Sequence, residues 1–348
     1  METDRTHRVA VIGLGGTIAM TAPAAGGGAV PALSPSQLVG SVPGLARTGI
    51  AVETVGLHGR PGSSVSFGDL DALREAVHQR LDAGTDGIVV TQGTDTIEET
   101  SYLLDLTYDR PAPVVVTGAM RNPSLAGADG PANLLAAIQT AGSEVARHQG
   151  VLVVFADEIH AARRVRKTHT SSPATFRSPT GGPLGYVVEG HPRLLNRLPH
   201  RRVVPVPAGA SRPRVGLVTV TLGDEGDGLA DLAGRYDGVV VAAFGAGHVA
   251  EPMVAPLAEL AARIPVVLGS RTGDGSVLAV TYGFPGSESN LLARGLLRAG
   301  FLDPCKARIL LYALLRATAD RDVIAAAFAV AGGYADPATW PWPRHRAG

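Results

Sequence analysis

Short apolar runs alternate with longer amphipathic segments over the first 155 residues of the chain. The runs are rich in valine and isoleucine and show no helical spacing, which is typical of strands that a parallel sheet buries on both faces. The predicted strands cover residues 9–12, 50–55, 87–90, 114–116 and 151–155, and the predicted helices cover residues 69–83, 96–106 and 133–146. This alternation predicts an α/β domain on a parallel sheet, of the flavodoxin-like or Rossmann-like kind.

A polar, proline-rich stretch over residues 191–213 interrupts this alternation and is the best candidate for a linker. Beyond it, predicted strands at 215–220, 238–243, 266–268 and 277–280 alternate with predicted helices at 229–235, 253–263, 289–299 and 305–316. The sequence therefore predicts a larger domain over residues 1–195, a linker over 196–213 and a smaller α/β domain over 214–348.

Residues 22–43 are rich in alanine, glycine and proline, and we expect a mobile loop there rather than a helix. Long loops in compact domains commonly act as lids. Because this one follows Thr17 closely, we expect it to become ordered when a ligand binds.

The composition indicates a globular protein without general affinity for polyanions. Its 31 basic and 31 acidic side chains give a formal net charge of zero, so we expect no nucleic-acid partner and no anionic membrane surface. No apolar run approaches the length of a membrane span, and no apolar signal core precedes the first strand. Cys305 is the single cysteine, which excludes an intrachain disulfide and favours a reducing compartment. We therefore expect a cytoplasmic protein.

Two of the predicted strands end in a glycine turn that presents a threonine. The first turn presents Thr17, and the second presents Thr94 with Asp95 beside it. Since the carboxyl ends of parallel strands border one crevice, we expect both hydroxyls at the same site. A hydroxyl beside a base can act as a nucleophile, and the N–H groups of a glycine turn can hold an oxyanion. The pair predicts acyl transfer; helix capping by each hydroxyl is the alternative interpretation.

The spacing of glycines and histidines argues against a nucleotide site and a metal site. After the first strand, Ile18 stands where a dinucleotide fingerprint has its third glycine, and the acidic Glu53 lies too far along the chain. The ten histidines include no helical pair with a glutamate, and Glu158 and His160 lack a further ligand at metal spacing. We therefore expect no metal and no cofactor.

The two turns lie in segments that resemble the L-asparaginase/glutaminase family. The matching segments are GGTIA at residues 15–19, GTDTIEET at 93–100, TGAMR at 117–121, ADGP at 128–131, VRKT at 165–168, FRS at 176–178, GPLG at 182–185, DP at 303–304 and KAR at 306–308. They occur in order over residues 9–316, which is nearly the whole chain.

The resemblance implies a threonine-dependent amide hydrolase that needs no cofactor. Thr17 matches the family's primary nucleophile, while Thr94, Asp95 and Lys167 match its second catalytic group. The implied reaction converts L-asparagine to L-aspartate and ammonia through a covalent acyl-enzyme.

The resemblance also implies a pocket for a free amino acid, which carries both charges. Ser63, which lies 31 residues before Thr94, matches the serine that holds the substrate's α-carboxylate, with Ser64 as the alternative position. Asp95 would bind the α-ammonium group. The other positions of the implied pocket are Gly93, Thr94 and Met120.

Two further positions of the implied pocket fall in the second domain. Glu288 matches, by its spacing before Gly300, a second ammonium-binding carboxylate that a neighbouring subunit contributes. His248 stands where the family often has an asparagine near the substrate's amino end. The resemblance thus implies a homotetramer, or at least a homodimer.

The chain departs from the family pattern in ways that affect the expected activity. No tyrosine precedes Tyr102, whereas the family commonly has one in the mobile loop, where this chain has residues 27–30. Gln92 stands where histidine is frequent, which keeps hydrogen bonding but removes a titratable group. A glutaminase or glutaminase-asparaginase is therefore one alternative, and an amino-acid sensor without catalysis is another.

Overall fold

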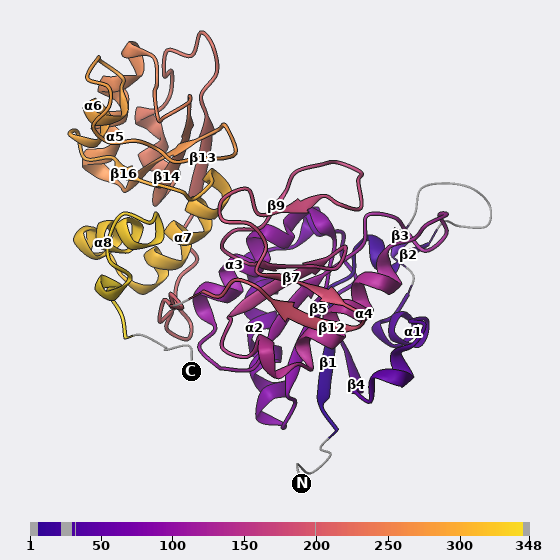
Figure 1. The fold of residues 1–348 in the computed structure, drawn as a ribbon. Helices are drawn as coiled ribbons and strands as arrows, with labels where there is room; N and C mark the ends of the chain where they lie inside the picture. The colour runs from indigo at the N-terminus through magenta and orange to yellow at the C-terminus, as the bar shows by residue number, and fades with distance from the viewer. Residues whose placement is uncertain (1–5, 22–29, 32, 199, 344–348) are drawn as a thin grey trace. The chain divides into compact units, whose positions relative to one another are not determined.

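The computed structural model describes residues 6–21, 30–31, 33–198 and 200–343, which form two compact units (Figure 1). The first unit extends to Arg201 and the second begins at Arg202, within the stretch expected to be a linker. Each unit has its own sheet and its own hydrophobic core. None of the described helices is long and apolar enough to cross a membrane.

The first unit is built on an eight-stranded sheet with the order β12-β11-β8-β7-β6-β5-β1-β4. Its strands are β1 (Arg8–Gly13), β4 (Ala51–Gly56), β5 (Gly87–Thr91), β6 (Val114–Thr117), β7 (Val151–Phe155), β8 (Glu158–Ala161), β11 (Gly185–Val188) and β12 (His191–Leu194). Strands β4, β1, β5, β6 and β7 are parallel and confirm the predicted α/β pattern. Strands β8, β11 and β12 extend the sheet in antiparallel fashion, so the sheet is mixed rather than purely parallel, and β12 occupies the start of the proline-rich stretch.

Helices cover both faces of this sheet (Figure 1). The helices of the first unit are α1 (Pro35–Gly40), α2 (Phe67–Asp82), α3 (Ile97–Thr107) and α4 (Gly130–Ala141). One core cluster joins buried residues of β1, β5, β6 and β7 to Leu38 of α1 and to Leu134 and Ile138 of α4. Helices α2 and α3 contact each other and pack on the parallel strands as well. The central strands are therefore buried on both faces, as their unbroken apolar pattern predicted.

Helix α1 lies inside the segment 22–43 that we predicted to be a loop. Ser34 starts the helix with a capping box: its hydroxyl accepts from the Gln37 N–H, and the Gln37 side chain accepts from the Ser34 N–H. The loop prediction is therefore wrong for Pro35–Gly40. The preceding residues form two short paired strands, β2 (Met20–Thr21) and β3 (Val30–Pro31), while residues 22–29 and 32 lie outside the described residues.

The second unit has a four-stranded parallel sheet with the order β13-β14-β15-β16. Its elements are β13 (Val215–Thr219), β14 (Gly238–Ala243), α5 (Val254–Arg263), β15 (Val266–Ser270), α6 (Glu288–Leu292), β16 (Leu297–Arg298), α7 (Pro304–Ala317) and α8 (Arg321–Ala331). Apolar residues of β14 and β15 pack against α5 and α6, and α7 contacts β13, β14 and β15.

The fourth strand of this sheet is not the one that the sequence predicted. Residues 277–280 pair with no strand; Val277 is buried, whereas Val280 is 92% exposed. The observed strand β16 lies inside the predicted helix 289–299, of which only residues 289–292 are helical, as part of α6. The predicted helix 229–235 is a 3₁₀ helix over Ala230–Gly234.

Candidate functional site

The two threonine turns lie at the carboxyl ends of adjacent strands. Thr17 begins a 3₁₀ helix that follows β1, and Thr94 begins another that leads from β5 into α3. Because β1 and β5 are paired and parallel, both turns emerge at the same edge of the sheet.

Three glycines bring the turns into direct backbone contact. A Cβ atom placed on Gly16 would lie 2.0 Å from the backbone nitrogen of Gly93, and one placed on Gly93 would lie 2.5 Å from the backbone nitrogen of Gly62. Only hydrogen-sized side chains permit such an approach. The segment that carries Ser63 therefore joins the two threonine turns in one cluster.

Ser63 and Ser64 lie in the short 3₁₀ helix Gly62–Ser64, and both are exposed. This turn is tied to the second threonine turn because Thr96 Oγ1 donates to the Gly62 carbonyl at 2.9 Å. The structure thus places the turn that carries both candidate serines beside Gly93, through the backbone of Gly62.

Lys167 reaches the second threonine turn from a distant part of the chain. It lies in a hairpin formed by β9 (Arg166–Lys167) and β10 (Phe176–Arg177). Its Nζ donates to Thr94 Oγ1 at 2.9 Å and to Asp95 Oδ1 at 2.8 Å. Thr94 is buried and the Lys167 side chain is largely buried, whereas the Asp95 side chain is 58% exposed. The group therefore opens to solvent on the side of Asp95.

Met120 belongs to the turn after β6, and this turn packs on the second threonine. A Cβ atom on Gly118 would lie 2.6 Å from the Gln92 carbonyl oxygen and 3.4 Å from Thr94 Cγ2. Asp129 fixes the turn by accepting hydrogen bonds from the backbone N–H groups of Met120 and Arg121.

Gln92 lies beneath the second threonine turn and is fully buried. Its amide group donates at 3.3 Å both to the Gly93 carbonyl and to Thr96 Oγ1. This side chain thus supports the turn through hydrogen bonds that do not titrate.

The residue that sequence reasoning missed is Glu98. Its Oε2 accepts a hydrogen bond of 2.8 Å from the backbone N–H of Lys167, so it ties β9 to α3. Glu98 lies in the segment 93–100 that carried the family resemblance, but nothing in its spacing indicates a partner 69 residues away.

Because His160 of β8 is buried, we expect the free energy of unfolding of the protein to fall in acid. The side chain of His160 is 0% exposed, and this burial lowers its pKa to about 4. The side chains of Glu158 and Ser178 lie next to its ring. The unfolded chain takes up this proton near pH 6.5. The free energy of unfolding should therefore fall as the pH drops from about 6.5 to about 4, with a total of about 3 kcal/mol from this group.

Denaturant unfolding of the wild type and of His160→Gln at pH 7 and pH 4.5 would measure this contribution. The variant lacks the titrating ring, so its stability should vary less between the two pH values. An equal pH dependence in both proteins would contradict the assignment.

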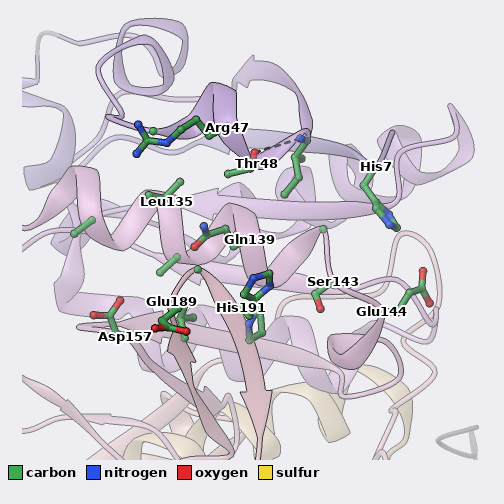
Figure 2. A pocket seen from close by; sticks show the side chains of 18 residues that line it. His7, Arg47, Thr48, Leu135, Gln139, Ser143, Glu144, Asp157, Glu189 and His191 are labelled. Atoms are coloured by element: carbon green, nitrogen blue, oxygen red, sulfur yellow. Dashed lines mark hydrogen bonds between the residues drawn. The ribbon is translucent and has the colours of Figure 1, made fainter. Parts of the chain in front are cut away.

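Two of the hollows in the first unit differ in their position relative to the threonine turns. One, of about 250 Å³, adjoins the first turn and is lined by Gly13, Gly15, Thr91 and His58 among others. The other, of about 790 Å³, follows α4 beside the β11–β12 hairpin (Figure 2). Figure 2 shows Arg47 on one wall of the larger hollow and acidic side chains on the other. None of the sequence-predicted site residues lines this larger hollow.

Glu288 and His248 contact each other in the second unit. Glu288 is 0% exposed; its Oε2 lies 3.2 Å from His248 Nε2, and its Oε1 accepts from the backbone N–H groups of Thr281 and Tyr282. Burial by itself would raise the pKa of Glu288, but the hydrogen bonds from Tyr282, Thr281 and His248 hold it below its usual range. Glu288 is thus an ionised carboxylate oriented within its own unit.

An exposed apolar surface lies next to this carboxylate. The side chain of Val280 is 92% exposed, that of Tyr282 is 44% exposed and that of Phe284 is 46% exposed. The His248 ring contacts both aromatic rings edge-on, with centroid distances of 4.8 and 5.2 Å. We call Tyr282 and Phe284 the aromatic surface.

Two family models match this chain and together cover most of it. The model described as "Asparaginase, N-terminal" matches residues 8–200, and the "Glutaminase/Asparaginase C-terminal domain" matches residues 214–328.

Individual relatives agree with these matches. The chain is 37% identical over 328 residues to a protein of Deinococcus radiodurans named "Probable L-asparaginase", covering 92% of this chain and 97% of that protein. It is 37% identical over 250 residues to "L-asparaginase 2" of Escherichia coli, covering 68% of each. Among solved structures, the probable cytoplasmic L-asparaginase from Campylobacter jejuni superposes with a TM-score of 0.83 at 32% identity, covering 93% of this chain and 99% of that one. The chain therefore belongs to the asparaginase/glutaminase family of hydrolases.

Proposed function

We propose that the protein hydrolyses L-asparagine to L-aspartate and ammonia by a threonine nucleophile. The observation that carries this proposal is the contact of Lys167 Nζ with both Thr94 Oγ1 and Asp95 Oδ1, beside the turn of Thr17. A hydroxyl, an amine and a carboxylate in hydrogen-bonding contact are the groups that an acyl transfer requires for proton movement.

The reaction proceeds in two displacements. Thr17 Oγ adds to the carboxamide carbon and gives up its proton; the carbon–nitrogen bond then breaks, and the leaving nitrogen takes a proton to depart as ammonia. Water, activated at the Thr94–Lys167 group, attacks the resulting ester; the ester bond to Thr17 breaks, one proton of the water returns to Thr17, and the carboxylic acid that forms ionises to L-aspartate. Backbone N–H groups of the Thr94 turn stabilise the oxyanion in both steps.

The substrate is held as a zwitterion. Ser63, or Ser64 next to it, donates to the α-carboxylate, and Asp95 accepts from the α-ammonium group. The exposure of both serines and of Asp95 supports this assignment, because a substrate must reach them from solvent. Gly93 and Met120 complete the wall on which the side chain of the substrate rests.

An ammonia-release assay with L-asparagine, L-glutamine and the two D-enantiomers tests this function. We expect hydrolysis of L-asparagine and a lower kcat/KM for L-glutamine, because one added methylene is worth only about 1–3 kcal/mol in a pocket. A higher kcat/KM for L-glutamine would support the glutaminase alternative. Binding of L-asparagine without release of ammonia would support a sensor protein.

We further propose that Glu288 completes the substrate site of a neighbouring subunit, in a homodimer or homotetramer. The aromatic surface beside Glu288 supports this, since exposed apolar patches commonly mark protein interfaces. The same carboxylate also orients the backbone of residues 281–282. A structural role within its own chain is therefore the competing explanation.

Mixing two variants separates these explanations. Thr17→Ala and Glu288→Ala should each be nearly inactive, but in a mixed dimer one site combines an intact Thr17 with an intact Glu288. Co-refolding the two proteins should therefore recover a measurable fraction of wild-type kcat. If mass spectrometry confirms mixed oligomers and activity does not return, Glu288 acts only within its own chain.

We propose a cytoplasmic location. Cys305 is the single cysteine, and the Campylobacter relative is named cytoplasmic, which supports this proposal. Recovery of the protein from a periplasmic or secreted fraction of its host would contradict it.

A further inference from the structure

Lys167 lies in a hairpin that is too short to hold its own position. Strands β9 and β10 contribute two residues each, and an isolated two-stranded hairpin is only marginally stable in water. Catalytic side chains nevertheless need placement to within about 0.5 Å. The hairpin must therefore be held by contacts with the rest of the unit.

Two of these contacts are already evident. Glu98 of α3 accepts the backbone N–H of Lys167 at 2.8 Å. The ring of Phe176, which pairs with Lys167 across the hairpin, lies 4.8 Å from the ring of Phe155 in β7. Both contacts lie at the paired residues Lys167 and Phe176, whereas β10 continues to Arg177.

We propose that His160 and Ser178 form a positioning pair that holds β10, and through it Lys167, in place over Thr94. Ser178 follows β10 directly, and its Oγ lies 3.0 Å from His160 Nδ1 in β8. His160 is 0% exposed and Ser178 is 7% exposed, so water does not compete for this hydrogen bond. The proposal rests on the proposed role of Lys167 in catalysis.

The pair is a support and not a second nucleophilic centre. Glu158 Oε2 lies 3.2 Å from His160 Nε2, which gives the three side chains the appearance of a Ser–His–Glu set. That contact lacks hydrogen-bond geometry, because His160 Nε2 has no hydrogen-bond partner among the described residues. A nucleophile must also meet a substrate carbonyl, and Ser178 is almost wholly covered by the protein.

Steady-state kinetics with L-asparagine tests the pair. Ser178→Ala removes the hydroxyl, and we expect kcat to fall between about tenfold and a hundredfold, because small misplacements of catalytic groups have effects of this size. The KM should stay within about twofold, since the substrate-binding groups are untouched. Ser178→Thr restores the hydroxyl and should recover most of kcat.

A matched control is available in α4. Thr140 is also 0% exposed, and its Oγ1 donates at 2.8 Å to the carbonyl of Ala136, so this hydrogen bond lies within α4 and not in the hairpin. Thr140→Val therefore removes a comparable buried hydrogen bond and should leave kcat within about twofold of wild type. If Ser178→Ala and Thr140→Val have the same kcat, the proposal is overturned.

Hydrogen exchange of the full-length protein gives a second readout that does not depend on activity. The N–H groups of Lys167 and Thr168 are hydrogen-bonded to Glu98 and Thr175, so they report the order of the hairpin. Their exchange should accelerate at least about tenfold in Ser178→Ala and not in Thr140→Val. Unchanged exchange in Ser178→Ala would also overturn the proposal.

The same two measurements, of kcat and of hydrogen exchange, remain decisive if Ser178→Ala does not fold or if the protein is not an amide hydrolase. If Ser178→Ala does not fold, Ser178→Cys keeps nearly the same volume with a weaker hydrogen bond, and the same changes in kcat and exchange are required of it. If the wild type releases no ammonia from any of the four amino acid amides, the proposed function fails. The exchange measurement then still decides whether the pair holds the hairpin.

Discussion

Thr17→Ala should lower kcat for L-asparagine by at least about a thousandfold, and Thr94→Val should have an effect of the same order. Both hydroxyls act on one carbonyl group, from turns whose backbones touch at Gly16 and Gly93. The double variant should be little worse than Thr17→Ala alone, because without the acyl-enzyme the water attack that Thr94 assists has no ester to act on.

The folded state should survive both changes. Removing a single hydroxyl in a turn usually changes stability by no more than about 1 kcal/mol, so thermal unfolding of each variant should stay close to wild type. Thr107→Ala serves as the control, since its hydroxyl donates to the Leu103 carbonyl at the end of α3 opposite to the Thr94 turn. Near-normal turnover by either Thr17→Ala or Thr94→Val would refute the two-threonine mechanism.

Gly16→Ala should disrupt both the site and the fold of the first unit. Gly16 has φ 90° and ψ −178°, a conformation that only glycine adopts readily and that costs other residues about 1–3 kcal/mol. The new Cβ atom would also lie 2.0 Å from the backbone nitrogen of Gly93, and backbone atoms cannot move aside as a side chain can. We expect at least about 3 kcal/mol of destabilisation, since strain and overlap both contribute.

In Gly16→Ala, kcat should fall further than partial unfolding of the protein alone would explain. Any shift that relieves the overlap separates the turn of Thr17 from that of Thr94, and a displacement of about 1 Å is enough to lower kcat about a hundredfold. Gly40→Ala, at the end of α1, has open space around its Cβ position and should leave kcat and urea unfolding unchanged. A Gly16→Ala protein with wild-type kcat would show that the two turns need not be in contact.

Local pattern predicted the parallel core of the first unit because these strands are buried on both faces. Val9, Val89 and Val115 lie in strands whose sequence is apolar without interruption. The antiparallel strands β11 and β12 have no such signal, since exposed residues such as Tyr186 and Val188 alternate with covered ones, and β12 includes a proline. Their place in the sheet depends on pairing partners that are distant in sequence.

Two helices were missed for different reasons. The capping box of α1 at Ser34 and Gln37 is readable from sequence, but the surrounding glycine and proline outweighed it. Helix α8 begins at Arg321, directly after Asp320, whose side chain caps the first turn, and its apolar run is typical of a packed helix. No element was predicted for residues 321–331, although this cap and this apolar run are readable from the sequence.

The candidate site was predictable as a set of residues but not as an arrangement. The resemblance to a known family pointed to Thr94, Asp95 and Lys167 as site residues. The structure places these three side chains in contact. No pattern in the sequence indicates that Gly16 and Gly93 touch or that Glu98 holds the backbone of Lys167. Such contacts arise when chain segments far apart in sequence fold against each other.

The glycine junction of residues 16, 62 and 93 has a consequence for attempts to change the substrate. Because backbone meets backbone there, no side chain is available whose size or polarity could be varied to reshape the site, and nearly every substitution would push the turns apart. In a mutant library that varies these three positions, most of the variants would misfold. Variation is better directed to Ser63 and Ser64, which are exposed, and to Met120, which is half-buried, because none of them is one of the junction glycines.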